Sequence, residues 1–297
     1  LIICNTIFSE AQKISIFSKI WKIPYVIFTY ALEINYKTTL KGMLWRKLSL
    51  RLADKVFCIS SYTQRLVNAL GVPFHKTCVI PGGVNVRDFS FSPRKRTTFV
   101  TRKFRLYNKK VILTIGRLVE RKGQDMVIKA MPLIKKEIPN AIYLIGGDGY
   151  YKENLQKLVK EYHLENEVIF AGRVKEEERQ SFYDACDVFV MPCRELENGD
   201  VEGFGIVFAE ANACGKPVIG GRSGGAVDAI IHGETGLLVN PWDVKEIAES
   251  IIYLLTHPDI ARKMGENGRR RVEKELDWNI LIEKVQKELK NLIRHTP

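Results

Sequence analysis

Two glutamates eight positions apart, Glu202 and Glu210, frame the stretch of the sequence best suited to chemistry. Between them lies the segment EGFGIVFAE, in which a Gly-Phe-Gly turn opens a helical run at Ile206. The N-terminus of a helix carries unpaired N–H groups and the positive end of the helix dipole, so it attracts phosphate. The pattern therefore predicts an anion-binding turn with a carboxylate on either side of it.

A second glycine turn of the same kind follows about twenty residues later in the chain. Gly215 and Pro217 end the first helical run, and an apolar strand begins at Val218. The triplet Ser223-Gly224-Gly225 then opens another helix. Each feature alone is common in doubly wound α/β domains. Together they place two helix N-termini with glycine approaches in one α/β unit.

This stretch resembles the nucleotide-sugar site of retaining glycosyltransferases of the GT-B fold, glycosyltransferase family 4. The similarity lies in the Glu-x7-Glu pair within EGFGIVFAEANACGKPVI, and it continues through SGGAVDAI and GETGLLV. It covers essentially the whole chain and is most specific in residues 111–241. The resemblance implies an α/β GT-B architecture, in which two Rossmann-like doubly wound domains face an interdomain cleft.

The resemblance also implies roles for individual residues. The segment GRLVERKG matches the family's Gly-Arg…Lys-Gly turn, whose cations bind the donor diphosphate. Glu210 resembles the residue that binds the donor ribose, and Glu202 resembles the one that faces the sugar hydroxyls. The residues expected to act in catalysis are Arg117, Lys122 and Glu202. The residues expected to bind the donor are Gly116, Arg173, Gly203, Phe204, Gly205, Ile206 and Glu210.

The implied reaction is transfer of a hexose from a UDP- or GDP-linked sugar to a hydroxyl acceptor, with retention at the anomeric carbon. Two fixed cations and helix-end N–H groups stabilise the departing diphosphate, so neither a metal nor a cofactor is expected. Glycolipid or envelope polysaccharide synthesis is the expected setting, and a lipid-linked acceptor is left open.

A non-catalytic remnant that binds a nucleotide sugar or a membrane surface is the alternative. It is kept because the family's first strands and their glycine loop have no counterpart here, so the N-terminal domain is expected to be incomplete. In addition, Tyr30 stands where family members often carry a histidine near the reacting carbon. Tyrosine is a poor acid or base near neutral pH, with a pKa of about 10. We expect Tyr30 to be a core residue at the end of a strand.

Strands and helices alternate along the chain, which favours parallel sheets with helices on both faces. Residues 1–88 are expected to form a partial acceptor-side Rossmann-like domain, and residues 89–108 a solvated basic linker. Residues 109–275 are expected to form the nucleotide-sugar-binding domain. Residues 276–297 have apolar side chains at helical spacing, and this helix either stays with the second domain or crosses back to the first.

The net charge of +12 is concentrated in residues 1–110, which hold 20 Lys and Arg against 4 Asp and Glu. Such asymmetry points to an anionic partner. Residues 37–55 predict a basic helix with leucines and Trp45, and we favour a helix whose leucines face its own sheet over one that docks on an anionic membrane. No nucleic-acid-binding motif accompanies the charge. The expected location is cytoplasmic, with a peripheral position at the inner face of the membrane left open.

Overall fold

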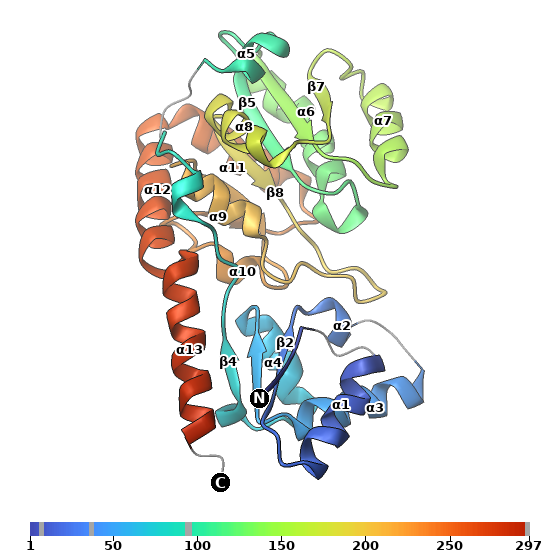
Figure 1. The fold of residues 1–297 in the computed structure, drawn as a ribbon. Coiled ribbons are helices and arrows are strands. Elements are labelled where there is room, and N and C mark those ends of the chain that lie inside the picture. Colours follow the sequence, from blue (N-terminus) through green and yellow to red (C-terminus); the bar gives the residue numbers. More distant parts are fainter. Residues whose placement is uncertain (6–8, 36–38, 93–96, 295–297) are drawn as a thin grey trace.

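The computed structural model contains two parallel β-sheets, each covered by helices on both faces (Figure 1). It describes residues 1–5, 9–35, 39–92 and 97–294. The strands of the first sheet, in spatial order, are β1 (Ile2–Cys4), β2 (Tyr25–Thr29), β3 (Lys55–Cys58) and β4 (Thr77–Val79). Those of the second sheet are β10 (Gly236–Val239), β9 (Val218–Gly221), β8 (Val188–Met191), β5 (Lys110–Ile115), β6 (Ala141–Gly146) and β7 (Val168–Gly172). The predicted two-domain α/β architecture is confirmed.

The helices alternate with these strands. Those that follow strands of the first sheet are α1 (Ser9–Ile20), α2 (Leu32–Asn35), α3 (Leu40–Leu52) and α4 (Ser61–Ala69). Those of the second domain are α5 (Phe99–Lys103), α6 (Gln124–Glu137), α7 (Lys152–Glu161), α8 (Arg179–Ala185), α9 (Ile206–Ala213), α10 (Ala226–Ala229), α11 (Val244–Thr256) and α12 (Pro258–Arg271). The last helix is α13 (Trp278–Arg294), and short 3-10 turns occupy Phe74–Lys76, Val86–Asp88, Glu120–Lys122 and Glu176–Glu178.

The first sheet is buried on both faces. Successive residues of a strand point to opposite sides of the sheet, so one strand contributes to two separate clusters. Tyr25 and Ile27 of β2 pack in a core with Leu50 of α3. Val26, between them, faces the other way and packs in a small cluster with Leu281 of α13. The C-terminal helix therefore supplies the second layer of the first domain.

Polar contacts fix α13 against this sheet, beside β4 (Figure 1). Glu288 forms an ion pair with Lys55 at 2.7 Å. The Lys284 ammonium donates to the Val79 carbonyl at 2.9 Å. At its start, the Trp278 N–H donates to the carbonyl of Val84 at 3.1 Å. The chain thus leaves the first domain and returns to it at adjacent points.

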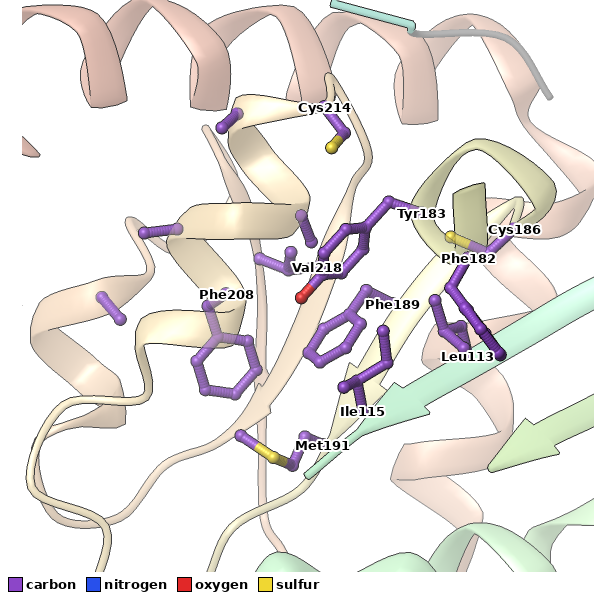
Figure 2. Packing of buried hydrophobic residues seen from close by; sticks show 14 of the residues in the cluster. Leu113, Ile115, Phe182, Tyr183, Cys186, Phe189, Met191, Phe208, Cys214 and Val218 are labelled. Carbon is purple, nitrogen blue, oxygen red and sulfur yellow. The ribbon is translucent and has the colours of Figure 1, made fainter. Parts of the chain in front are cut away.

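The second sheet divides its residues between two cores in the same alternating manner. Leu113 of β5 lies in the cluster beneath α8 and α9, and its neighbour Ile112 lies in the cluster beneath α6 and α11. In the first cluster the Phe189 ring packs between two others, with centroids 5.9 Å from Tyr183 and 5.7 Å from Phe208 (Figure 2). This packing holds α8 and α9 side by side.

The segment predicted as a solvated basic linker, residues 89–108, is in part packed, so that prediction is wrong for its second half. Residues 99–103 form α5, and Val100 and Leu106 are fully buried in the core of the second domain. The charged side chains of Lys103 and Arg105 dominate the sequence pattern, and they obscure the apolar residues that pack inward. Residues 93–96 lie outside the described part of the chain.

The carboxyl ends of parallel strands meet at one edge of a sheet, where ligands of open α/β folds bind. In the second domain, the loops that start at this edge include residues 116–123 after β5, residues 192–205 after β8, and residues 222–225 after β9. These loops carry most of the residues that the sequence singles out.

Candidate active site

A buried cluster of one carboxylate and two cations lies where the loops after β5 and β8 meet. One oxygen of Glu202, Oε2, accepts from the Arg121 guanidinium at 2.7 Å and from the Lys122 ammonium at 2.5 Å. All three residues are less than 10% exposed. Lys122 also lies against the end of β5, since a Cβ added to Gly116 would be 4.0 Å from its Nζ atom.

A glycine brings the two loops together. Gly123 has φ of +74°, a left-handed conformation that ends the 3-10 turn Glu120–Lys122 and starts α6. A Cβ at this position would lie 2.3 Å from the carbonyl oxygen of Pro192. The backbones at Gly123 and Pro192 therefore approach more closely than a residue with a side chain would allow. This close approach brings Lys122 into contact with Glu202.

Burial opposes ionisation of Glu202, but Lys122 and Arg121 outweigh it and lower the pKa of the carboxyl from 4.5 to about 2. Glu202 is therefore a carboxylate at neutral pH and has no proton to donate. Because its pKa is lower in the folded state, its contribution to stability is complete above pH 4.5 and is lost as the pH falls toward 2.

We expect the difference in unfolding free energy between wild type and Glu202→Gln to be constant from pH 5 to 8 and to shrink below about pH 4.5. Urea unfolding at a series of pH values measures it. A difference that instead grows as the pH falls would show that the ion cluster does not stabilise the carboxylate.

The turn before α9 is shaped by the residues that bracket it. Gly205 has φ of +88° and caps α9, leaving Ile206 40% exposed at the start of the helix. Phe204 is buried, only 2% exposed. A Cβ at Gly203 would lie 2.5 Å from the carbonyl oxygen of Tyr30, so this turn touches the first domain.

Tyr30 is not the core residue that its position at the end of a strand predicts, because its side chain is 40% exposed. It follows β2 at the domain interface, and its hydroxyl donates to Asn5. Burial, and then the Glu33 carboxylate, raise the pKa of Tyr30. Tyr30 therefore lies beside the turn before α9, and its hydroxyl is protonated at neutral pH.

Glu210 is buried one turn further along α9 and is held by two side chains of α8. Its Oε1 accepts from Arg179 and its Oε2 from the Tyr183 hydroxyl, both at 2.7 Å. Figure 2 shows Tyr183 reaching from α8 toward α9. Burial, and then Glu210, raise the pKa of Tyr183 well above its usual range, so it remains a donor. A carboxylate has about four acceptor sites, so Glu210 retains capacity for ligand hydroxyls.

Glu210 faces a pocket of 670 Å³ between the second domain and the connection from the first. Ile206 and Arg179 line it from the second domain, and Trp278 from the start of α13. A separate pocket of 360 Å³ lies where β5, β8 and β9 begin, at the edge opposite the carboxyl ends. We assign the site to the larger pocket because it opens at the ligand-binding edge.

The structure brings together only some of the predicted site residues. Lys122, Glu202 and Gly116 are adjacent, and Ile206 and Glu210 share the larger pocket. Arg117 and Arg173 are exposed, and neither side chain makes a hydrogen bond or ion pair within the described residues. Among those residues no cluster of His, Cys, Asp and Glu suits a metal ion.

Three residues that form hydrogen bonds of 2.7 Å with the predicted glutamates were not predicted from the sequence. Arg121 was passed over because the motif directs attention to Arg117. Arg179 and Tyr183 are four residues apart and so share one face of α8. That spacing is a usable signal, but only once α8 is known to lie beside α9.

Two Rossmann-like domains joined by a short connection, with the last helix returning to the first, define the GT-B class of glycosyltransferase folds. The Anabaena protein Alr3699/HepE, solved in complex with UDP, has this fold with a TM-score of 0.85 at 23% identity, over 97% of this chain and 78% of that one. Sucrose-phosphate synthase from Thermosynechococcus elongatus matches with a TM-score of 0.83 at 26% identity, over 98% and 73%.

The family model described as "Glycosyl transferases group 1" matches residues 97–271, and the chain belongs to this family. A curated relative, the GDP-mannose-dependent alpha-(1-6)-phosphatidylinositol monomannoside mannosyltransferase of Mycobacterium tuberculosis, is 38% identical over 234 residues. That match covers 78% of this chain and 60% of the relative. A Methanocaldococcus jannaschii protein described as an uncharacterized glycosyltransferase is 30% identical, over 89% and 68%.

Proposed function

We propose that this protein transfers mannose from GDP-mannose to a hydroxyl of a lipid-linked acceptor, with retention at the anomeric carbon. The observation that carries the proposal is the buried contact of Lys122 with Glu202, directly before the N-terminus of α9. It sets a cation, a carboxylate and helix-end N–H groups at one edge of the sheet. The mannosyltransferase relatives, 38% identical, support the choice of donor and acceptor.

In this proposal the chain's own groups stabilise the departing GDP. The bond from the anomeric carbon to the diphosphate breaks, the acceptor oxygen takes its place, and the acceptor's proton leaves with the diphosphate. Lys122, Arg117 and the N–H groups of α9 bind the growing negative charge, so no metal is required. Glu202, ionised and shared by two cations, binds sugar hydroxyls rather than acting as nucleophile or base.

Carboxylates at the pocket also favour guanine as the base. Glu176 lines the 670 Å³ pocket together with Glu210. Guanine offers two adjacent donors, N1–H and N2–H, that one carboxylate accepts together. Uracil offers a single N–H that lies between two carbonyl oxygens. A carboxylate that accepts from this N–H is repelled by both oxygens. In this arrangement Glu210 accepts from the ribose hydroxyls and Glu176 from the base.

Calorimetric titration tests this assignment directly. We expect GDP to bind about tenfold more tightly than UDP, which corresponds to about 1.4 kcal/mol. Glu176→Ala should reduce this preference, and Glu210→Ala should weaken both nucleotides. Glu165→Ala, which removes an exposed acid outside the pocket, is the matched control. Equal affinity for the two nucleotides would contradict the base assignment, and no binding of either would contradict the donor site.

The acceptor side of the proposal includes peripheral contact with an anionic membrane. The prediction that the leucines of the basic helix face its own sheet is wrong for Leu40, Leu44 and Leu48 of α3, which are exposed, and holds for Leu50, which is buried against the sheet. The neighbouring helix α1 packs against α3 (Figure 1). Its apolar residues Ile16, Phe17 and Ile20 are exposed in the same way. We define the α1–α3 patch as Ile16, Phe17, Ile20, Trp21, Leu40, Met43, Leu44 and Leu48, each 38% to 71% exposed.

The same two helices also carry exposed basic side chains. They are the exposed residues Lys13, Lys19, Lys41, Lys47 and Arg51. Apolar side chains that enter the interface, rimmed by cations that meet anionic headgroups, are typical of helices lying on a bilayer. Within the described residues, no helix combines the length and the apolar character needed to cross a bilayer.

Vesicle co-sedimentation tests the patch. We expect the protein to bind phosphatidylglycerol-containing vesicles at low salt, and Ile20→Glu with Leu44→Glu to lower the bound fraction severalfold. Phe74→Glu, which changes a 71% exposed residue of the same domain outside the patch, should leave binding unchanged. Equal binding by the double variant and wild type would show that the α1–α3 patch does not contact the membrane.

A further inference from the structure

The loop from Pro192 to Gly205, which carries Glu202, is held in different ways at its base and its tip. At the base, Arg194 is 1% exposed and its guanidinium donates to both carboxylate oxygens of Asp125, at 2.9 and 3.0 Å. Arg121 pairs with Asp200 at 3.0 Å as well as with Glu202. These buried contacts fix the base of the loop to the second domain.

The tip of the loop is held instead by the first domain. The Asn35 amide, at the end of α2, donates to Glu195 Oε1 at 2.8 Å and to the Gly199 carbonyl at 3.1 Å. The Tyr62 hydroxyl, in the first turn of α4, donates to Glu195 Oε2 at 3.0 Å. Burial, and then the Glu195 carboxylate, raise the pKa of Tyr62, so it stays a donor across the neutral range.

Gly199 allows this approach of the two backbones. Its φ is +84°, and a Cβ there would lie 2.5 Å from the carbonyl oxygen of Asn35. A side chain at this position would push the tip away from α2. The geometry is therefore that of a fitted contact and not of two surfaces that merely face each other.

The same turn of α4 receives a second carboxylate from the second domain. Asp228 of α10 accepts from the Ser61 hydroxyl at 2.7 Å and from the Ser61 N–H. A carboxylate at a helix N-terminus is favoured by the helix dipole. Glu195, from the loop after β8, and Asp228, from α10, thus contact α4 from two different segments of the second domain.

We propose that Glu195 is a positioning residue, through which the first domain holds the Glu202 loop in its donor-binding arrangement when the domains are closed. The difference in burial between the base and the tip of the loop supports this role. Arg194 is buried, so its contacts stay formed, whereas Glu195 is exposed and its contacts with Asn35 and Tyr62 can break at modest cost. Its effect on turnover rests on the proposed transferase function, but its effect on domain closure does not.

The chain offers a conservative variant and a matched control. Glu195→Ala removes both hydrogen bonds, and Glu195→Gln keeps an acceptor for Asn35. Glu197→Ala removes an exposed acid of the same loop that makes no hydrogen bond or ion pair with the described residues. Each variant is compared with wild type by small-angle scattering and by steady-state transfer from GDP-mannose, with GDP affinity measured in parallel.

We expect Glu195→Ala to increase the radius of gyration and to lower kcat about five- to tenfold, with GDP affinity within about twofold of wild type. Glu195→Gln should lie between the two, and Glu197→Ala should match wild type. An unchanged radius of gyration in Glu195→Ala overturns the proposal whether or not the chain turns over. A loss of GDP affinity as large as the loss of kcat overturns it too, because it would assign Glu195 to the folding of the donor site itself.

Discussion

Lys122→Ala is expected to lower kcat for mannose transfer about 100- to 1,000-fold, the size of effect seen when one preorganised donor to a developing negative charge is removed. Lys122 is 8% exposed, so no water takes its place with equal effect. The substitution also leaves Glu202 paired with Arg121 alone. Steady-state transfer from GDP-mannose measures the loss.

The matched control is Lys136→Ala, which removes an exposed lysine in the last turn of the adjacent helix α6. It should change kcat less than twofold, as expected for a surface charge away from the site. If kcat of Lys122→Ala is within about threefold of wild type, Lys122 does not stabilise the leaving group.

Asp125→Ala is expected to lower the unfolding free energy by about 3 to 5 kcal/mol, because it leaves a buried cation without its main partner. Besides the Tyr151 hydroxyl, the Arg194 guanidinium would keep the Glu120 carboxylate at 3.6 Å and the Trp242 ring, whose centroid is 4.5 Å away. None of these replaces the two short hydrogen bonds from Arg194 to Asp125. Urea unfolding at pH 7 measures the change.

Asp259→Ala provides the comparison, since it breaks an exposed ion pair with Arg262 that has a similar distance of 2.9 Å. We expect it to cost less than about 1 kcal/mol. If the two substitutions destabilise the protein equally, burial is not what gives the Arg194 contact its strength.

The fold could be predicted from the sequence because its signals are local. Apolar runs alternate with helical periodicity, and glycines mark the strand-to-helix turns. The second half of the expected linker was wrong for a local reason too: a run of basic residues hid Val100 and Leu106, which pack into the core. The exposed leucines of α3 show the opposite error, in which apolar residues on a helix were assigned to a core that does not bury them.

The candidate site was predictable as a set of motif positions but not as a set of contacts. The motif contains Arg117 and Arg121, and only the 3-10 turn that Gly123 ends determines that Arg121 meets Glu202. The contacts of Glu195 join residues 133 and 160 positions apart in the chain. No pattern within one segment carries information about such a pair, so these contacts emerge only from the packing of the two domains.

The central proposal, that this chain is a retaining mannosyltransferase with an acceptor of the kind named for its relatives, is tested most directly by transfer of labelled mannose from GDP-mannose to phosphatidylinositol monomannoside. We expect a labelled glycolipid whose new linkage is α, formed as well in EDTA as in Mg²⁺ and formed far more slowly by Glu202→Gln. Tight binding of GDP-mannose without any labelled product would contradict the claim and favour a non-catalytic nucleotide-sugar-binding protein. A product with a β linkage would contradict retention.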